Sequence, residues 1–189
     1  LAYAGLLRSD EITAGSGKSD ASLNLTRDAV QFFPDFETCT HMVLTLPGSK
    51  SDPFRKGVSL TIAAAPGHAS CPVTAVKKLF VEFPRPGSAP LFEGLDGKPL
   101  HYKVFVAGIR TALTAAGIYP SGFVGHSFRR GAASEAAAAG YSDYEIQLLG
   151  RWRSDSYKLY IENSPSRILY LSYQLHLAHP HSVPFEPPA

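Results

Sequence analysis

The sequence predicts an α+β domain that is mostly α-helical and carries one small three-stranded antiparallel sheet. Two observations predict this class. Three short stretches rich in β-branched and aromatic residues follow one another between residues 28 and 63, with turn residues between them. From residue 72 onward, the apolar residues recur at helical spacing. Strands and helices segregated along the chain in this way are typical of α+β folds.

The first third of the chain is predicted to build the sheet. Residues 1–12 read as the end of a helix that runs into a loop, and the strands are expected at 28–33, 41–46 and 57–63. The connection between the last two strands, PGSKSDPFRK, is rich in turn residues. It therefore predicts a hairpin with a basic loop.

Two amphipathic helices are predicted to follow the sheet. Pro72 suits the first position of a helix over 73–83, because the N–H that proline lacks has no partner there. The segment PRPGSAP at 84–90 is a loop, and the apolar spacing predicts a second helix over 100–117.

The ends of the next two helices are marked by their residue types. Ser127 is the expected N-cap of an alanine-rich helix, and Gly140 is its natural stop. Ser142 and Glu145 form a capping box at the start of the following helix, and Gly150 is its expected C-cap.

The C-terminal part is predicted to hold two further helices. Ser154 caps a short helix over 154–161, and Ser164 and Pro165 begin a last one over 166–178. The last helix carries more apolar surface than one packed face needs. It is expected either to complete the core of its own domain or to pack on a neighbouring copy.

The chain shows no internal repeat or boundary, so residues 1–178 are expected to form one domain, followed by a Pro-rich tail at 179–189. It begins at Leu1, and its only methionine is Met42. We therefore expect an N-terminally truncated chain, either a fragment or a processed form.

The composition indicates a globular protein. Of 189 residues, 44% are hydrophobic and 18% charged, and no apolar run approaches the length that crosses a bilayer. Two cysteines predict neither a disulfide framework nor a zinc site, and they favour a reducing compartment. A net charge of +2 is weaker than most free-standing nucleic-acid modules carry. Composition alone therefore does not predict a DNA-binding protein.

A set of polar and aromatic residues at the ends of these elements points to a chemistry. The set is Arg8, Lys50, His126, Arg129, Trp152 and Tyr160. Two guanidinium groups can bind the non-bridging oxygens of a phosphate and neutralise the charge that grows in its transition state. A histidine can accept the proton of an attacking tyrosine, and a lysine can donate one to the departing oxygen. The set fits phosphoryl transfer with no metal and no cofactor.

The order of the motifs resembles a known family. The segments GLLRSDEI, GSKSDPFRKGVSL and GHSFRRGAASEAAAAGYSDYEIQLLGRWRSDSYKLYI look like the successive motifs of the tyrosine recombinase (phage-integrase) family. The form LGRWRSDSYKLYI is similar to the eukaryotic Crypton-type recombinases of mobile elements. An ordered series over residues 1–175 is far more specific than any single motif. It implies the fold of the catalytic domain of DNA breaking-rejoining enzymes, which closes around DNA.

The resemblance also implies roles for the basic residues. Arg8 matches the first catalytic arginine, and Lys50 matches the lysine of the hairpin loop. His126 and Arg129 match the HxxR motif, and they lie three residues apart at the positive end of the alanine-rich helix. Arg55 and Lys56 in the same loop are rivals of Lys50.

The aromatic positions follow in the same way. Trp152 matches the family's His/Trp position, where its indole N–H can donate to a phosphate oxygen. Tyr160 matches the nucleophile, with Tyr157 as its rival on the same helix face. Glu11 reads as a partner that orients an arginine. Arg130, one residue beyond the HxxR arginine, reads as a surface charge or a phosphate-backbone contact.

The resemblance implies a site-specific recombinase or integrase that cleaves and rejoins DNA through a 3′-phosphotyrosyl intermediate. Its partners are double-stranded DNA and copies of itself in a tetrameric synapse, with no membrane. The location is nuclear if the protein is eukaryotic, and otherwise cytoplasmic. A type IB topoisomerase-like enzyme, a catalytically silent DNA-binding module and a helical interaction domain are the alternatives.

Overall fold

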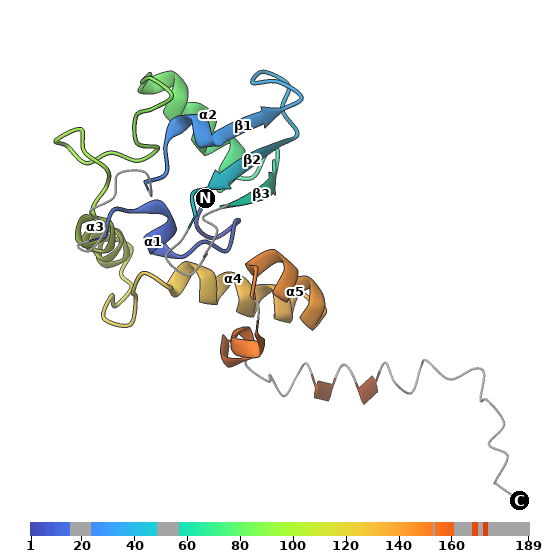
Figure 1. Ribbon diagram of the computed structural model, residues 1–189. Coiled ribbons are helices and arrows are strands. Elements are labelled where there is room, and N and C mark those ends of the chain that lie inside the picture. The colour runs from blue at the N-terminus through green and yellow to red at the C-terminus, as the bar shows by residue number, and fades with distance from the viewer. Residues whose placement is uncertain (16–23, 49–56, 153, 161–167, 170–171, 174–189) are drawn as a thin grey trace, which may run out of the picture.

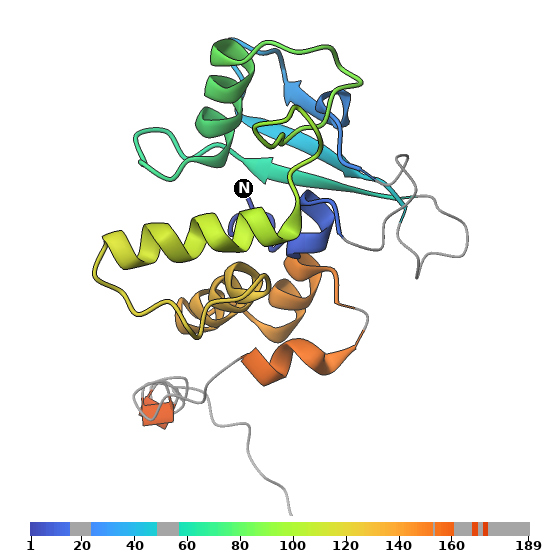
Figure 2. The same cartoon turned by 90° about the vertical axis from the view of Figure 1, so that its left-hand side faces the viewer.

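The structure is a computed structural model, and it describes residues 1–15, 24–48, 57–152, 154–160, 168–169 and 172–173. In chain order its elements are α1 (Ser9–Ile12), η2 (Arg27–Ala29), β1 (Val30–Phe33), β2 (His41–Leu46), β3 (Val58–Ala63), α2 (Pro72–Glu82), α3 (Tyr102–Ala115), α4 (Ser127–Ala138), α5 (Asp143–Gly150) and η3 (Asp155–Tyr160), where η marks a 3₁₀ helix. Figure 1 places the sheet and α2 at one end of the molecule and α4, α5 and η3 at the other. Figure 2 shows the same division from the side, with the N-terminal segment and α1 between the two parts.

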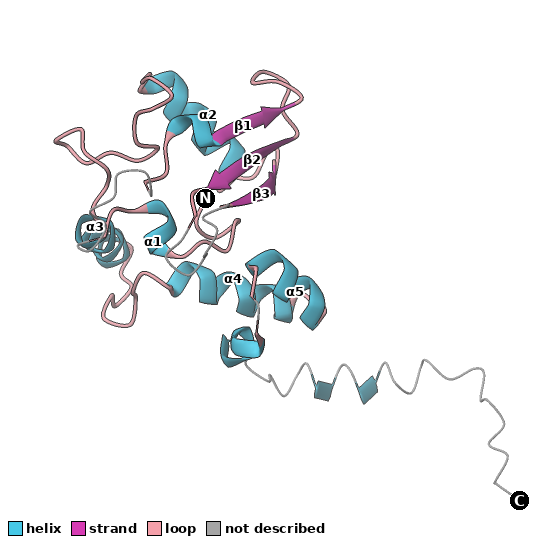
Figure 3. Cartoon of the chain, viewed as in Figure 1, coloured by secondary structure: helices cyan, strands magenta, loops and turns pink. Residues whose placement is uncertain are grey.

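The three strands form one antiparallel sheet in the order β1-β2-β3, as the sequence predicts (Figure 3). Side chains along a strand alternate between its two faces. In the central strand β2 this alternation buries Met42, Leu44 and Leu46. One face of the sheet therefore points into a core.

This first core also anchors the N-terminal segment. Val73 and Val76 of α2 belong to the same cluster of buried residues as the apolar side chains of the sheet. Leu7 and Ile12 join this cluster from either side of Arg8. The position of Arg8 is therefore tied to the sheet.

A second, smaller core lies among α4, α5 and η3. Its buried residues are Leu6, Ala132, Ala133, Ile146 and Tyr157. Leu6 and its neighbour Leu7 thus belong to different cores. The N-terminal segment is the seam that joins the sheet to the helices.

Helix α2 is capped by a thiol. The Sγ of Cys71 accepts hydrogen bonds from the N–H groups of Ala65 (3.2 Å) and Thr74 (3.5 Å). Burial by itself would raise the pKa of this thiol, but the bonds from Thr74 and Ala65 outweigh it and lower the pKa from 9.0 to about 7. The thiolate therefore stabilises the folded state.

We predict that the Cys71 cap makes stability depend on pH. Because the folded pKa lies below the unfolded one, the stabilisation grows as pH rises from 7 to 9 and is lost as pH falls below 7. Cys71→Ser should abolish this dependence, and Cys71→Ala should cost about 1 kcal/mol of unfolding free energy. Urea unfolding of the three proteins at pH 6 and pH 9 measures both effects. Equal pH profiles for the wild type and the serine variant would contradict the prediction.

The predicted helices over 73–83 and 100–117 are confirmed as α2 and α3, within two residues at each end. The capping box of Ser142 and Glu145 is confirmed, since each side chain bonds the other residue's backbone N–H. Gly140 stops α4 as predicted, with a left-handed φ of 92°. None of the described helices is both long and apolar enough to cross a membrane.

Two predictions about the N-terminal segment and α4 are wrong. Residues 2–6 form turns rather than a helix, and only Ser9–Ile12 are helical, so Arg8 precedes α1 instead of ending a helix. The physical reason is Leu6, whose φ of 45° lies outside the right-handed helical region. The N-cap of α4 is His126, because the Ser127 hydroxyl accepts from the N–H of Val124 instead of capping the helix.

The C-terminal predictions fall mostly outside the described residues. The short helix predicted over 154–161 is the 3₁₀ helix η3. Within the predicted last helix, residues 168–169 and 172–173 are helical, and Ile168, Leu169 and Tyr173 are exposed. The rest of that helix and the tail at 179–189 lie outside the described part of the chain.

Candidate functional site

Arg129, in the first turn of α4, is buried between two segments that are far apart in sequence. Its Nη1 donates to the carbonyl of Leu6 and its Nη2 to the carbonyl of Gly150, each at 2.5 Å. Its guanidinium carbon lies 4.0 Å from the centroid of the Trp152 ring. A planar guanidinium held at both ends and stacked on one face has a fixed orientation. The sequence predicts Arg129 as a site residue, and the fold shows how its head is held.

Arg8 stands two residues after the carbonyl that Arg129 binds. Its guanidinium pairs with Asp10 (3.3 Å) and with Glu11 (3.4 Å), and its backbone N–H donates to Glu11 Oε2 at 2.8 Å. The Arg8 side chain is 38% exposed, whereas that of Glu11 is 14% exposed. The Arg8 guanidinium can therefore reach an anion at the surface while Glu11 holds the Arg8 backbone.

His126 lies beside α1. With Ser9, Asp10 and Lys103 it lines a pocket of about 220 Å³. The chain before His126 can lie this close to α1 only because residue 125 is glycine, since a Cβ at Gly125 would overlap the Ser9 side chain. His126 is itself exposed.

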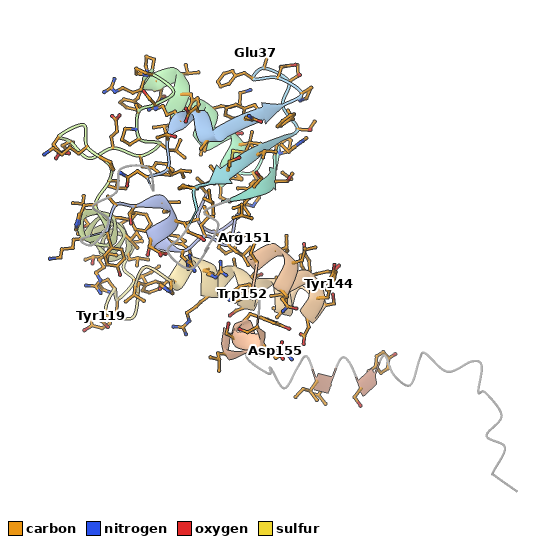
Figure 4. The ribbon with its side chains drawn as sticks, in the orientation of Figure 1. Glu37, Tyr119, Tyr144, Arg151, Trp152 and Asp155 are labelled. Carbon is orange, nitrogen blue, oxygen red and sulfur yellow. The ribbon has the colours of Figure 1, made fainter. Side chains whose placement is uncertain are left out.

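Trp152 follows α5 and packs between α4 and η3 (Figure 4). Its ring centroid lies 5.7 Å from that of Tyr157. The Arg129 guanidinium stacks on one face of the indole, so Trp152 limits where that guanidinium can lie. The core role that the sequence leaves open for this tryptophan is therefore confirmed, and the same side chain contacts Arg129.

The two candidate tyrosines differ in their surroundings. Tyr157 is buried in the second core, and burial raises the pKa of its phenol, an effect that the Asp143 carboxylate strengthens. Tyr160 is the last residue of η3, and its side chain lies outside the described part of the structure. The environment of Tyr157 is that of a packing residue.

The fold brings most of the predicted site residues to the segment 5–12. Arg8 belongs to it, Arg129 binds its Leu6 carbonyl, Trp152 stacks on Arg129, and His126 faces its Ser9 and Asp10. The pocket beside His126 is lined by neither Arg129 nor Trp152. Lys50, with its rivals Arg55 and Lys56, lies in 49–56, outside the described residues.

This architecture is shared with DNA recombinases of known structure. XerA recombinase matches 92% of this chain with 53% of its own length, at a TM-score of 0.62 and 19% identity. XerH site-specific recombinase, in a post-cleavage complex with its palindromic difH substrate, matches 92% with 43% of its length, at 0.64 and 15%. The Tn1549 transposon integrase bound to a circular intermediate DNA matches 92% with 55% of its length, at 0.55 and 12%. The chain has the fold of a tyrosine recombinase catalytic domain.

The tyrosine recombinase fold is recognised here from structure. No protein-family model and no curated protein matches the sequence. The chain spans about half the length of the solved recombinases that it matches.

One residue of this recombinase fold is missed by the sequence analysis. Arg151 follows α5 with a φ of 58°, and it donates from Nη1 to the Gly5 carbonyl (3.0 Å) and from Nη2 to Glu11 Oε2 (3.1 Å). Figure 4 shows it between the N-terminal segment and α5. The left-handed region costs a non-glycine residue about 1 kcal/mol. No signal in the sequence marks Arg151, since glycine is the residue expected in that conformation.

The structure corrects the role of Gly150. The predicted C-cap is the last residue of α5, and Arg151 takes the left-handed position, with the N–H groups of Arg151 and Trp152 donating to the carbonyls of Leu148 and Gln147. Glycine is required at 150 for another reason. A Cβ there would overlap the six-membered ring of Trp152.

We predict that Gly150→Ala displaces the indole of Trp152. The overlap should cost about 1–3 kcal/mol of unfolding free energy and shift the fluorescence of Trp152, the only tryptophan in the chain. Gly131→Ala is the matched control, because α4 has open space around a Cβ at that position. That change should stabilise by up to about 1 kcal/mol and leave the emission unchanged. Two alanine variants with the same emission and melting temperature would refute the prediction.

Proposed function

We propose that this chain is the catalytic domain of a site-specific DNA recombinase or integrase that cleaves and rejoins DNA by transesterification. The observation that carries the proposal is that Arg129, stacked on Trp152, binds the carbonyl of Leu6, two residues before Arg8, in a tyrosine recombinase fold. The 3₁₀ helix that follows Trp152 ends at Tyr160. This 3₁₀ helix packs on α4, the helix that carries Arg129, which supports Tyr160 as the nucleophile.

The proposed reaction proceeds in two balanced transfers. The Tyr160 oxygen attacks the scissile phosphorus, and the bond from phosphorus to the 5′ oxygen breaks, which leaves a 3′-phosphotyrosyl link and a free 5′ hydroxyl. His126 accepts the phenol proton, and Lys50 donates a proton to the 5′ oxygen. Attack by a 5′ hydroxyl then reverses these steps and releases the tyrosine.

The two arginines have different tasks in this proposal. Arg129 is fixed by the carbonyls of Leu6 and Gly150, so it presents a preorganised charge to the phosphate. Arg8 is bound to Asp10 at the surface, where an incoming phosphate competes with this carboxylate. Binding of DNA would therefore exchange one partner of Arg8 for another.

The type of recombinase, its location and its assembly belong to the same proposal. The motif LGRWRSDSYKLYI favours a Crypton-type recombinase of a mobile element, acting on double-stranded DNA in the nucleus. The exposed Ile168, Leu169 and Tyr173 favour packing of the last helix on another copy in a tetrameric synapse.

The test is covalent capture. The chain is incubated with a pool of nicked duplexes of randomised sequence, and a protein–DNA adduct that survives denaturation is sought. The proposal expects an adduct in which the protein is linked to the 3′ phosphate at the cleavage site. When two such duplexes are captured together, it expects their strands to be exchanged between them. Relaxation of supercoiled DNA with no exchange would indicate a topoisomerase, and DNA binding with no adduct would indicate a silent module. A chain that neither binds DNA nor forms an adduct would overturn the proposal.

A further inference from the structure

Arg151 joins two parts of the molecule that are far apart in sequence. Its guanidinium bridges the Gly5 carbonyl and the Glu11 carboxylate, and the side chains of Arg151 and Glu11 are 16% and 14% exposed. Charged groups this shielded from water interact strongly, so the pair fixes the distance between α1 and the end of α5.

Glu11 passes this constraint on to Arg8. The same Oε2 atom that accepts from Arg151 also accepts from the Arg8 backbone N–H at 2.8 Å, and Oε1 lies 3.4 Å from the Arg8 guanidinium. One carboxylate therefore holds the backbone and the head of Arg8 while it is itself held by Arg151.

The residues on either side of Arg151 contact Arg129. Arg151 is followed directly by Trp152, on which Arg129 stacks, and the Gly150 carbonyl before it binds Arg129. Residues 150–152 thus contact both arginines of the site, Arg129 directly and Arg8 through Glu11. A left-handed arginine at such a junction persists only because its surroundings determine it.

We propose that Arg151 is a positioning residue that sets Arg8 relative to Arg129 by holding Glu11. The proposal rests on the proposed function for its catalytic consequence, but its structural claim concerns this chain alone. A second account assigns Arg151 only to the fold, through its bond to the Gly5 carbonyl.

The experiment uses variants that separate these accounts. Arg151→Gln removes the ion pair with Glu11 and, because the glutamine side chain is two bonds shorter, the bond to the Gly5 carbonyl as well. Glu11→Gln removes the same pair from the other side, together with the Glu11–Arg8 pair, and leaves the bond from Arg151 to the Gly5 carbonyl in place. Arg85→Gln is the matched control, because it removes the Arg85–Glu93 pair (3.3 Å), which lies outside this cluster.

The first readout is hydrogen exchange of the Arg8 amide, measured by NMR without DNA. Loosening Glu11 should speed this exchange about tenfold in Arg151→Gln, and the Arg85→Gln control should match the wild type. Unchanged exchange at Arg8 in a folded Arg151→Gln protein would overturn the proposal, whether or not the protein cleaves DNA.

The second readout is the rate of adduct formation at saturating nicked DNA. Arg151→Gln and Glu11→Gln should each slow it about tenfold with little change in half-saturation, and the double variant should be no slower than either. Additive losses would assign Arg151 to the fold alone. A wild type that forms no adduct would overturn the proposed function and the catalytic consequence, while the exchange result would still decide the structural claim.

Discussion

Tyr160→Phe should abolish covalent adduct formation while leaving the affinity for DNA nearly unchanged. The substitution removes only the oxygen that attacks phosphorus, and phenylalanine fills the same volume at the end of η3. Adduct yield on nicked duplexes and binding by fluorescence anisotropy measure the two quantities. The adduct should fall below detection, since no other step of the reaction replaces a missing nucleophile.

Tyr157→Phe is the matched control for this prediction. Its phenol is buried against the second core, and burial together with the Asp143 carboxylate raises its pKa, so at neutral pH the group is protonated and shielded from DNA. The Tyr157→Phe protein should retain adduct formation. If this variant alone loses the adduct, the nucleophile is Tyr157 and the assignment of Tyr160 is wrong.

Arg129→Ala and Arg129→Lys should both lose stability and adduct formation, and the two losses can be measured separately. Alanine leaves the buried carbonyls of Leu6 and Gly150 without donors, which should cost about 3 kcal/mol of unfolding free energy. Lysine keeps the charge, but it cannot donate in two directions and stack on Trp152 at the same time. Chemical denaturation measures the stability of each variant.

Activity should fall further than stability explains. At a temperature where Arg129→Lys is folded by circular dichroism, its adduct rate should be roughly 100-fold below that of the wild type, because a preorganised donor to the transition state is lost. Arg110→Lys serves as the stability control, since Arg110 also donates to a carbonyl, that of Phe123, but at the exposed surface of α3. Full activity in folded Arg129→Lys would remove Arg129 from the phosphate site.

The elements that the sequence predicts correctly are those whose causes are local. The three strands, the helix that begins at Pro72, the capping box of Ser142 and Glu145 and the stop at Gly140 all follow from the conformational preferences of a few neighbouring residues. The order of the site motifs, from Arg8 to Tyr160, is likewise a property of the sequence. These features can therefore be predicted from the sequence alone.

Features that depend on contacts between distant residues could not be predicted from the sequence. The carbonyls that hold Arg129 belong to Leu6 and Gly150, which lie 123 and 21 residues away along the chain. The left-handed Arg151 and the turn at Leu6 contradict local preference. Gly150 is a glycine because the fold places the Trp152 ring where its side chain would be. Local propensity is worth only about 1 kcal/mol per residue, so buried hydrogen bonds and packing at the seam between the two cores override it there.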